Sequence, residues 1–394
     1  MSRVLYFVGA GLTKSLALQA HPIPAMFDFI TTAAEYLFDQ IVLTTLAALE
    51  IAEPYPYAWG TPLCRTLADQ LLDRNQQPPP DLQSRFRQAL RDKPSESVED
   101  LLDRTGGRAS NLPSQTADLR FQYALARIFA LIEWQVNWHP LDTFLRCQFQ
   151  NRDSAHTFVS FNYDLVLDHA IERCRGRLDL LDIYGFRPIG GIVSDPTGNP
   201  PGARITALRQ QQASELDTFI LKPHGSLNWW AKGFQTGTPA DEVWRDATVV
   251  IPITESGGVR YVLSTHTQQW VHLPDELGFL VEPVILTPRS VKKPEREFLA
   301  NIRLHEEQAI CSAEEVFILG WSIPRTDVDQ EDLIRNAVSK RATPFRRVTV
   351  VNRNAGVEYF KRVKDIFAVA DPNLLRICNS GFEQFSVSQA SAAY

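Results

Sequence analysis

Cysteine is scarce in this sequence, and its distribution excludes two kinds of stabilised fold. The five cysteines are widely scattered, and no two of them are separated by only two residues. That short spacing is the usual signature of a structural zinc site, so a zinc knuckle is excluded. An odd number of scattered cysteines also argues against a disulfide framework and favours a reducing compartment. We therefore expect a cytoplasmic protein without a bound metal.

Strong charge and long apolar runs are also lacking. The formal net charge is -6, which gives no electrostatic reason to expect direct nucleic-acid binding. A local basic face around Arg341, Arg346 and Arg347 is an alternative, but we favour a solvated surface near a helix end. The apolar stretch 38–51 is too short and too polar to span a bilayer, and the run 4–8 is too short for a signal segment. No membrane partner is expected.

Short apolar runs that alternate with helical patterns predict the fold class. The runs are rich in Val, Ile, Leu and Phe and are bounded by turn residues, as buried strands are. The predicted strands are 4–8, 157–161, 218–222, 284–287, 316–319, 348–351 and 375–378. The predicted helices that follow several of them are 165–173, 295–309, 329–340 and 355–367. This alternation predicts an α/β fold with a Rossmann-like parallel sheet covered on both faces.

Two regions interrupt the alternation and predict a helical insertion and a small mixed α/β module. The segments assigned to the Rossmann-like domain are 1–24, 151–184, 216–226 and 281–388. Residues 25–150 are mainly helical in pattern and form the insertion. Residues 185–215 and 227–280 contain short strand-like pieces among Pro and Gly and form the small module. We expect the last residues, from 388 onward, to fray.

The first predicted strand runs into a glycine turn, Gly9-Ala10-Gly11-Leu12-Thr13-Lys14-Ser15, and then a helix start. Glycines allow close approach to phosphate oxygens, and the N–H groups and dipole of a helix start stabilise an anion. A hydride-transfer fingerprint needs glycine at position 14, and a Walker A loop needs glycine at position 13, so both motifs fail. Gly9, Ala10, Gly11 and Thr13 remain candidates for binding a dinucleotide. The alternative is an ordinary strand-to-helix turn.

Two further turns carry polar side chains at the ends of predicted strands, where ligands bind in open α/β sheets. Asn162 offers amide donors and an acceptor that suit ribose hydroxyls or a carboxamide, and Asp164 follows it before the next helix. The alternative for both is capping of that helix. His224 precedes Gly225 and is the type of side chain that exchanges protons near neutral pH. The alternative is a strand-end histidine bonded to a loop.

Taken in order, these motifs resemble the sirtuin family. That family carries Gly-Ala-Gly at its first turn, Asn-x-Asp after a central strand and His-Gly after a later strand. Two supporting matches are the strand that ends in Gly320-Trp321-Ser322 and the strand that ends in Asn352. The four-cysteine zinc module of the protein-deacylating members is missing. Their Pro-Asp-Phe-Arg is missing too, since the nearest stretch, 23–29, lacks the arginine.

Within that family, the runs 161–164 and 222–229 look like the NAD-consuming sirtuin-like proteins of bacterial anti-phage defence. The resemblance implies that Asn162 and His224 are catalytic and that NAD is the substrate. It further implies that Gly320, Ser322 and Asn352 lie beside the adenosine ribose and phosphates. Such proteins form homo-oligomers, and some act with a separately encoded HerA-type ATPase or another defence partner. We expect nicotinamide and ADP-ribose as products, without a metal.

Two other functions stay open at this point. An NAD-dependent protein deacylase would need a groove for an acyl-lysine peptide, and the absent zinc module and the large insertion argue against it. A non-catalytic module would sense NAD or ADP-ribose and assemble with a partner. The presence of both Asn162 and His224 argues against that alternative without excluding it.

Overall fold

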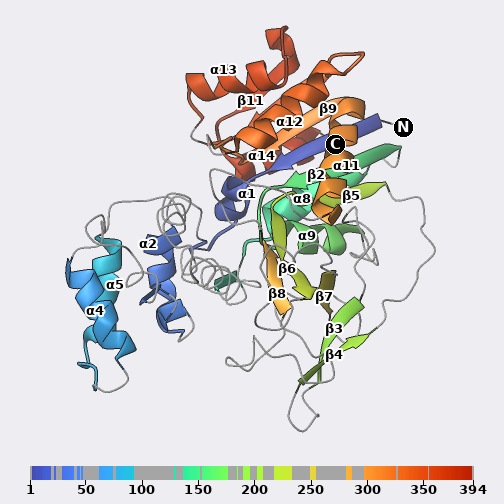
Figure 1. Cartoon of the computed structure of the whole chain (residues 1–394). Helices are drawn as coiled ribbons and strands as arrows, with labels where there is room; N and C mark the ends of the chain where they lie inside the picture. Colours follow the sequence, from blue (N-terminus) through green and yellow to red (C-terminus); the bar gives the residue numbers. More distant parts are fainter. Residues whose placement is uncertain are drawn as a thin grey trace. The chain divides into compact units, whose positions relative to one another are not determined.

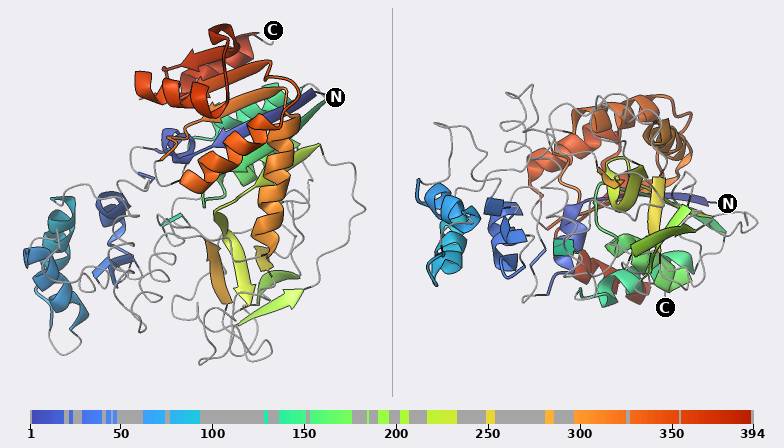
Figure 2. Two further views of the ribbon diagram at one scale, coloured as in Figure 1. Left: turned by 45° about the horizontal axis from the view of Figure 1, so that its top comes forward. Right: turned by 60° about the horizontal axis from the view of Figure 1, so that its bottom comes forward.

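The computed structural model of the chain divides into two compact units, and each is described by itself (Figures 1 and 2). Unit 1 comprises Met1–Ala17, Val136–Ile285 and Lys293–Tyr394, and unit 2 comprises Leu18–Gln135 and Leu286–Lys292. The structure describes residues 2–18, 22–23, 29–39, 42–44, 46–47, 62–73, 77–92, 128–129, 136–150, 153–175, 184, 190–195, 202–206, 217–232, 249–253, 281–285, 297–324, 327–353 and 355–392.

A six-stranded parallel sheet forms the centre of unit 1 (Figure 1). Its strands are β1 (Ser2–Val8), β2 (Ser154–Ser160), β5 (Thr218–Leu221), β9 (Glu315–Leu319), β10 (Arg347–Val351) and β11 (Leu375–Cys378). The spatial order is β11-β10-β9-β1-β2-β5, and every neighbouring pair is parallel. Read from β5, this is the 3-2-1-4-5-6 order of a doubly wound Rossmann fold. The predicted α/β Rossmann-like fold is confirmed.

Two layers of helices cover this sheet. One layer contains α8 (His139–Phe149), α9 (Val166–Arg175) and α14 (Phe382–Ala392), and the other contains α11 (Glu297–Ser312), α12 (Val328–Ser339) and α13 (Val357–Ile366). Four of these helices, α9, α11, α12 and α13, match predicted ones to within a few residues. Residues 388–392, which we expected to fray, belong to α14.

Alternation along β1 shows that the two layers lie on opposite faces of the sheet. Successive side chains of a strand point to opposite faces. The ring of Tyr6 stacks on Phe158 at 4.3 Å and meets the edge of Phe144 in α8 at 6.0 Å. The ring of Phe7 meets Phe367, directly after α13, at 5.4 Å. Aromatic burial of this kind stabilises the core on both faces and explains why the central strands are continuously apolar.

A second, mixed sheet of five strands follows directly from β5 in unit 1. Its strands are β3 (Gly190–Asp195), β4 (Gly202–Thr206), β6 (Gly225–Lys232), β7 (Val249–Ile253) and β8 (Val281–Ile285), in the order β4-β3-β7-β6-β8. Only residues 222–224 separate β5 from β6, so this short turn joins the two sheets. We assigned 281–285 to the Rossmann-like domain, and that assignment is wrong because β8 pairs antiparallel with β6.

Unit 2 contains the described part of the helical insertion. Its helices are α2 (Phe29–Ala33), the 3-10 helix η1 (Ala34–Tyr36), α4 (Pro62–Leu72) and α5 (Leu82–Arg91). The side chains of Phe29, Leu67 and Phe86 are buried, so these helices turn apolar faces inward. The insertion ends at residue 135 and not at 150, because α8 packs against α9 and α14 of unit 1. The helical pattern predicted for 25–150 included an apolar periodicity in 121–138, and most of that stretch lies outside the described residues.

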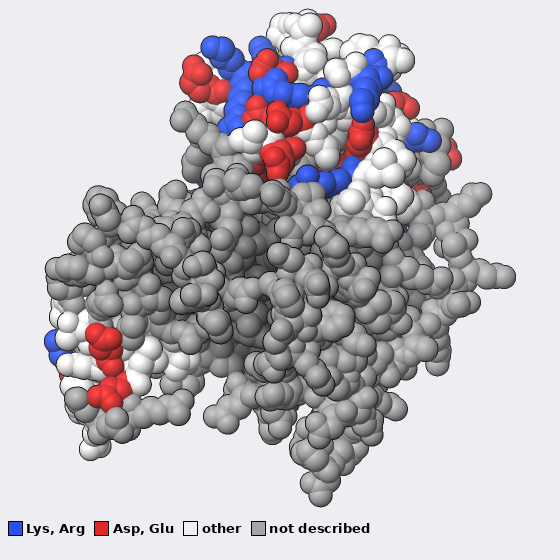
Figure 3. Space-filling model, viewed as in Figure 1, with Lys and Arg blue, Asp and Glu red and all other residues white. Residues whose placement is uncertain are grey.

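The basic residues near the start of β10 are engaged within unit 1. Arg346 and Arg347 both pair with the carboxylate of Glu315, and Arg341 donates to the carbonyl oxygen of Ala313 at 2.6 Å. Basic and acidic side chains are also intermixed on the described surface in Figure 3. These contacts favour the solvated surface that we preferred to a basic binding face. Among the described helices, none combines the length and apolarity needed to cross a membrane. The five cysteines, all among the described residues, form no disulfide with one another.

Candidate functional site

The register of the parallel sheet brings five turns to one edge. Val8 pairs with both Ser160 and Leu319, and Leu319 pairs with Val351, so β1, β2, β9 and β10 end at the same level. Val159 pairs with Leu221, so β5 ends beside them. The turns that follow these strands contain the predicted site residues Gly9, Ala10, Gly11, Thr13, Asn162, Asp164, His224, Gly320, Ser322 and Asn352. The strand order reverses between β1 and β9, and ligands bind at this switch point in doubly wound sheets.

Three glycines let the turns after β1 and β9 pack directly on each other at the switch point. A Cβ atom on Gly9 would lie 2.5 Å from Cα of Trp321, and one on Gly11 would lie 2.7 Å from the carbonyl oxygen of Gly320. Gly320 has φ +63, and a Cβ there would overlap the backbone nitrogen of Leu12. Residues that carry a side chain rarely adopt this positive φ, and a side chain would not fit between the two turns. Close packing of the two turns therefore explains these glycines.

The same packing uses backbone donors that we expected to face phosphate. The N–H groups of Gly9, Gly11 and Leu12 donate to the carbonyl oxygens of Leu319, Gly320 and Gly9, at 3.0, 3.0 and 2.9 Å. Helix α1 (Ala10–Ser15) has only six residues, so its dipole is small. These three N–H groups are thus bonded to carbonyl oxygens of the protein. That this turn contacts the dinucleotide stays a prediction.

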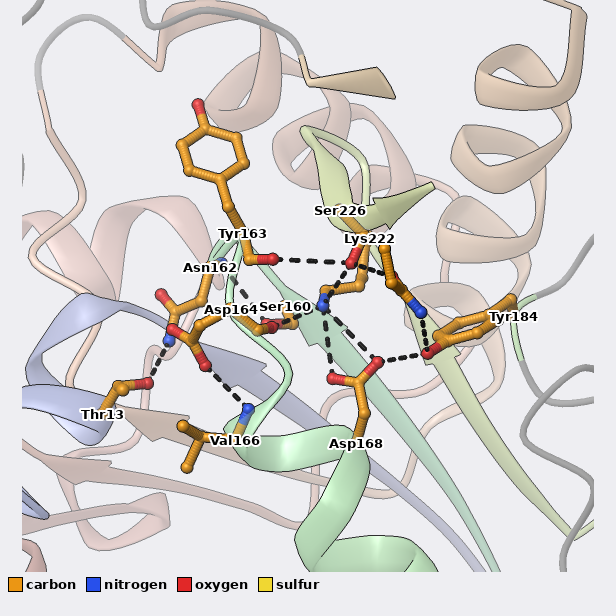
Figure 4. Close-up of polar contacts among 11 residues, drawn as sticks. Thr13, Ser160, Asn162, Tyr163, Asp164, Val166, Asp168, Tyr184, Lys222 and Ser226 are labelled. Atoms are coloured by element: carbon orange, nitrogen blue, oxygen red, sulfur yellow. Dashed lines mark hydrogen bonds and ion pairs between the residues drawn. The ribbon is translucent and has the colours of Figure 1, made fainter. Parts of the chain in front are cut away.

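Asn162 joins the turn after β2 to the turn after β1 (Figure 4). Its amide nitrogen Nδ2 donates to the hydroxyl of Thr13 at 2.9 Å and to the carbonyl oxygen of Gly9 at 3.1 Å. Both side chains are buried. The two amide hydrogens are thereby used, and within the described residues no group donates to Oδ1 of Asn162. The oxygen is therefore the part of this amide that can orient a hydroxyl or a water.

Asp164 extends this contact and also serves the start of α9. Its Oδ1 accepts the first backbone N–H of the helix, from Val166, at 3.0 Å, as the capping alternative predicts. The hydroxyl of Thr13 lowers the pKa of the same carboxylate. Burial raises the pKa of Asp164, while Lys222, the N–H of Val166 and the hydroxyl of Thr13 oppose the rise. Thr13 thus binds Asn162 and favours the ionised form of Asp164.

A buried lysine that our sequence reasoning missed ties β5 to the turn after β2 (Figure 4). Nζ of Lys222 donates to the backbone oxygen of Asp164 at 2.6 Å and to Oγ of Ser226 at 2.8 Å. It also lies 3.2 Å from Oδ2 of Asp168, and both side chains of this ion pair are fully buried. The hydroxyl of Tyr184 donates to Oδ1 of Asp168 at 2.6 Å. A lysine that ends an apolar strand is the only sequence signal for this network.

His224 lies in the turn between β5 and β6 and is buried beside an aspartate. Its Nε2 is 3.7 Å from Oδ1 of Asp327, which precedes α12. Its ring lies 5.4 Å from the ring of Phe161, the neighbour of Asn162, and Phe161 stacks on Trp321 at 4.5 Å. The turns that carry the amide and the imidazole are therefore in contact. Asp327 was not predicted, since only its place at a helix start marks it in the sequence.

The two supporting motifs lie on the other side of the switch point. Gly320 donates its N–H to the carbonyl oxygen of Val351 at 2.9 Å, which brings the turn after β9 against the turn that contains Asn352. Ser322 is exposed and Asn352 is half-buried. The hydroxyl of Tyr359 donates to the backbone oxygen of Trp321 at 2.6 Å and contacts the side chain of Asn352. All the predicted residues thus belong to one continuous edge.

The site defines a doubly wound α/β protein with a polar edge built from an amide, a carboxylate and an imidazole. No protein-family model and no curated protein matches this chain. In the part of the chain that the structure describes, no group of three His, Cys, Asp or Glu side chains is arranged to hold a metal ion.

Proposed function

We propose that this chain is a sirtuin-like NAD hydrolase, which binds NAD at the edge described above and cleaves its nicotinamide–ribose bond. One observation carries the proposal. The turn of Asn162 is bonded to the glycine turn at the switch point, and its neighbour Phe161 contacts His224. An amide and a candidate base therefore lie at the edge of the sheet where a doubly wound fold holds a dinucleotide.

The reaction needs one bond to break and one to form at the same ribose carbon. The bond between C1′ and the nicotinamide nitrogen breaks, and its electron pair leaves with neutral nicotinamide. The ribose then carries positive charge, and a preorganised polar site that stabilises this charge lowers the barrier. A water oxygen bonds to C1′ and loses a proton. The products are nicotinamide, ADP-ribose and one proton.

Two side chains supply the help that this step requires. Oδ1 of Asn162 accepts a hydrogen bond from the attacking water or a ribose hydroxyl, because its amide nitrogen is engaged with Thr13 and Gly9. His224 accepts the proton of the water, and such general-base help contributes ~10²–10⁴-fold to a rate. Asp164 contributes to the nicotinamide pocket, and Gly320, Ser322 and Asn352 flank the adenosine end. These roles rest on the family resemblance together with the positions of the turns.

The biological setting that fits this activity is depletion of NAD during bacterial anti-phage defence. It rests on the runs around Asn162 and His224, which look like that branch of the sirtuin family. A homo-oligomer and a separately encoded partner, such as a HerA-type ATPase, belong to the same proposal. Because unrestrained NAD loss kills the host, we expect the isolated chain to be inactive until it is triggered.

The test follows NAD by chromatography with the purified protein, alone and with any protein encoded beside it. We expect nicotinamide and ADP-ribose in equal amounts from the wild type in its triggered state. Asn162→Ala and His224→Ala should lose at least ~10²-fold in turnover, the lower end of general-base help. Undiminished turnover in both folded variants would defeat the residue assignment. An O-acetyl-ADP-ribose product from acetylated peptide would indicate a deacylase instead.

A further inference from the structure

The imidazole of His224 and the carboxylate of Asp327 form a buried couple across two distant segments. Nε2 of the ring and Oδ1 of the aspartate are 3.7 Å apart, and the residues are only 6% and 4% exposed. This separation is longer than a hydrogen bond. Catalytic contacts in unliganded enzymes are often long and shorten when the substrate binds. A carboxylate that faces one ring nitrogen favours a proton on that nitrogen even before contact.

Both partners of this couple are held by neighbouring structure. The ring of His224 lies against Phe161, and Phe161 stacks on Trp321. The backbone of Asp327 is anchored at the start of α12, where its carbonyl oxygen accepts the N–H of Glu331 at 2.9 Å. Its carboxylate makes no capping bond to the helix. A carboxylate at this position would ordinarily cap the helix, and here it lies toward the ring of His224.

We propose that Asp327 is a positioning residue that keeps a proton on Nε2 of His224 and leaves Nδ1 as the basic nitrogen. This assignment rests on the proposed function, because it makes Nδ1 the atom that takes the proton of the attacking water. As the water oxygen bonds to C1′, the proton moves to Nδ1, and Asp327 stabilises the imidazolium that forms. The imidazolium then returns the proton to solvent. The carboxylate itself stays ionised and contacts no substrate.

The tautomer of His224 tests this assignment without any turnover. The chain has eight histidines, so we would label histidine with ¹⁵N and assign His224 by its loss in His224→Asn. We expect Nε2 to carry the proton in the wild type near neutral pH. Asp327→Asn should shift the His224 nitrogen resonances toward the other tautomer. Asp329→Asn removes the same charge from an exposed position two residues later and should leave them unchanged.

Steady-state kinetics with NAD give a second test, because loss of a merely structural residue would not lower kcat alone and leave KM unchanged. Asp327→Asn should lower kcat by about 10²-fold while KM stays near the wild-type value, because binding is intact and general-base help is lost. Asp327→Glu should recover part of kcat because it restores a carboxylate. It also serves as the second variant if the asparagine variant does not fold. Asp329→Asn should match the wild type.

The two proposals fail in distinguishable ways. A wild-type His224 protonated on Nδ1, or a resonance pattern that Asp327→Asn leaves unchanged, overturns the positioning role. A rise in KM with unchanged kcat also overturns it. A protein that never cleaves NAD, even with its partner, overturns the proposed function. In that case the tautomer measurement still decides whether Asp327 sets the protonation of His224.

Discussion

Replacement of Thr13 by valine removes the hydroxyl that holds the two central turns together. Valine keeps the branched shape, so the change is largely confined to the polar contacts. The hydroxyl accepts from Nδ2 of Asn162 at 2.9 Å and lowers the pKa of the carboxylate of Asp164. An amide hydrogen of Asn162 is then left buried without its partner, which costs about 1–3 kcal/mol. The pKa of Asp164 should rise further, because one group that lowers it is lost.

Equilibrium unfolding in urea measures this cost, and NAD turnover measures its effect on the site. We expect the free energy of unfolding to fall by about 1–3 kcal/mol in Thr13→Val and by less in Thr13→Ser, which keeps a hydroxyl. We also expect kcat to fall by up to about 10²-fold, since small displacements of a positioned group are costly.

Ser15→Ala is the matched control, because the hydroxyl of Ser15 donates only to the local carbonyl oxygen of Leu12 in the described contacts. It should change stability by about 1 kcal/mol or less and leave kcat unaltered. The reasoning is refuted if Thr13→Val unfolds at the wild-type urea concentration and turns over NAD at the wild-type rate.

Two further predictions concern the packing and the titration of unit 1. Gly320→Ala should lose at least about 1–2 kcal/mol of stability, because Gly320 has φ +63 and a Cβ would overlap Leu12. Gly356→Ala, where a Cβ meets nothing within 4 Å, is the control, and equal losses in calorimetry would contradict the packing argument. Burial raises the pKa of Glu306 from 4.5 to about 8, against Gln330 and Arg303. Between pH 4.5 and about 8, Glu306 keeps its proton in the folded chain and loses it in the unfolded chain. The free energy of unfolding of the wild type therefore falls as the pH rises through this range. Glu306→Gln should remove that fall, by up to about 1.4 kcal/mol per pH unit, and parallel stability–pH curves for the two proteins would refute it.

The central strands could be predicted because their signal is local. β9 is buried at every position, and its apolar run reads as a strand whatever its neighbours are. The local sequence of a strand does not show which of the two sheets it joins. β8 looks the same in sequence whether it pairs in the first sheet or with β6, so its assignment depended on long-range pairing. The helix α14 was not predicted, because its Ser-rich sequence carries little periodicity.

The candidate site likewise contains residues that the local sequence predicts and partners that only the fold brings together. The residue types of Asn162 and His224 at strand ends could be read from the sequence, because turn chemistry is local. The partners that hold them could not, since Thr13 reaches Asn162 and Asp327 reaches His224 across the fold. Lys222 holds the backbone of Asp164 in the same way. From the sequence, we related Gly9 and Gly11 to phosphate binding and missed their role in the packing of two turns. A Cβ on Gly9 or Gly11 would lie only 2.5 or 2.7 Å from the neighbouring turn, so close packing demands glycine as strictly as a phosphate does. A single sequence does not separate these two causes.

The most direct test of the central claim is calorimetric binding of carba-NAD to the purified wild type. A methylene replaces the ribose ring oxygen in this analogue, so it cannot be cleaved through a charged ribose, and an untriggered protein can still be tested. We predict saturable binding with one molecule per chain, weakened in Gly320→Ala and in Thr13→Val. Absence of binding by the folded wild type, alone and with its partner, would contradict the claim that this edge of the sheet is an NAD site.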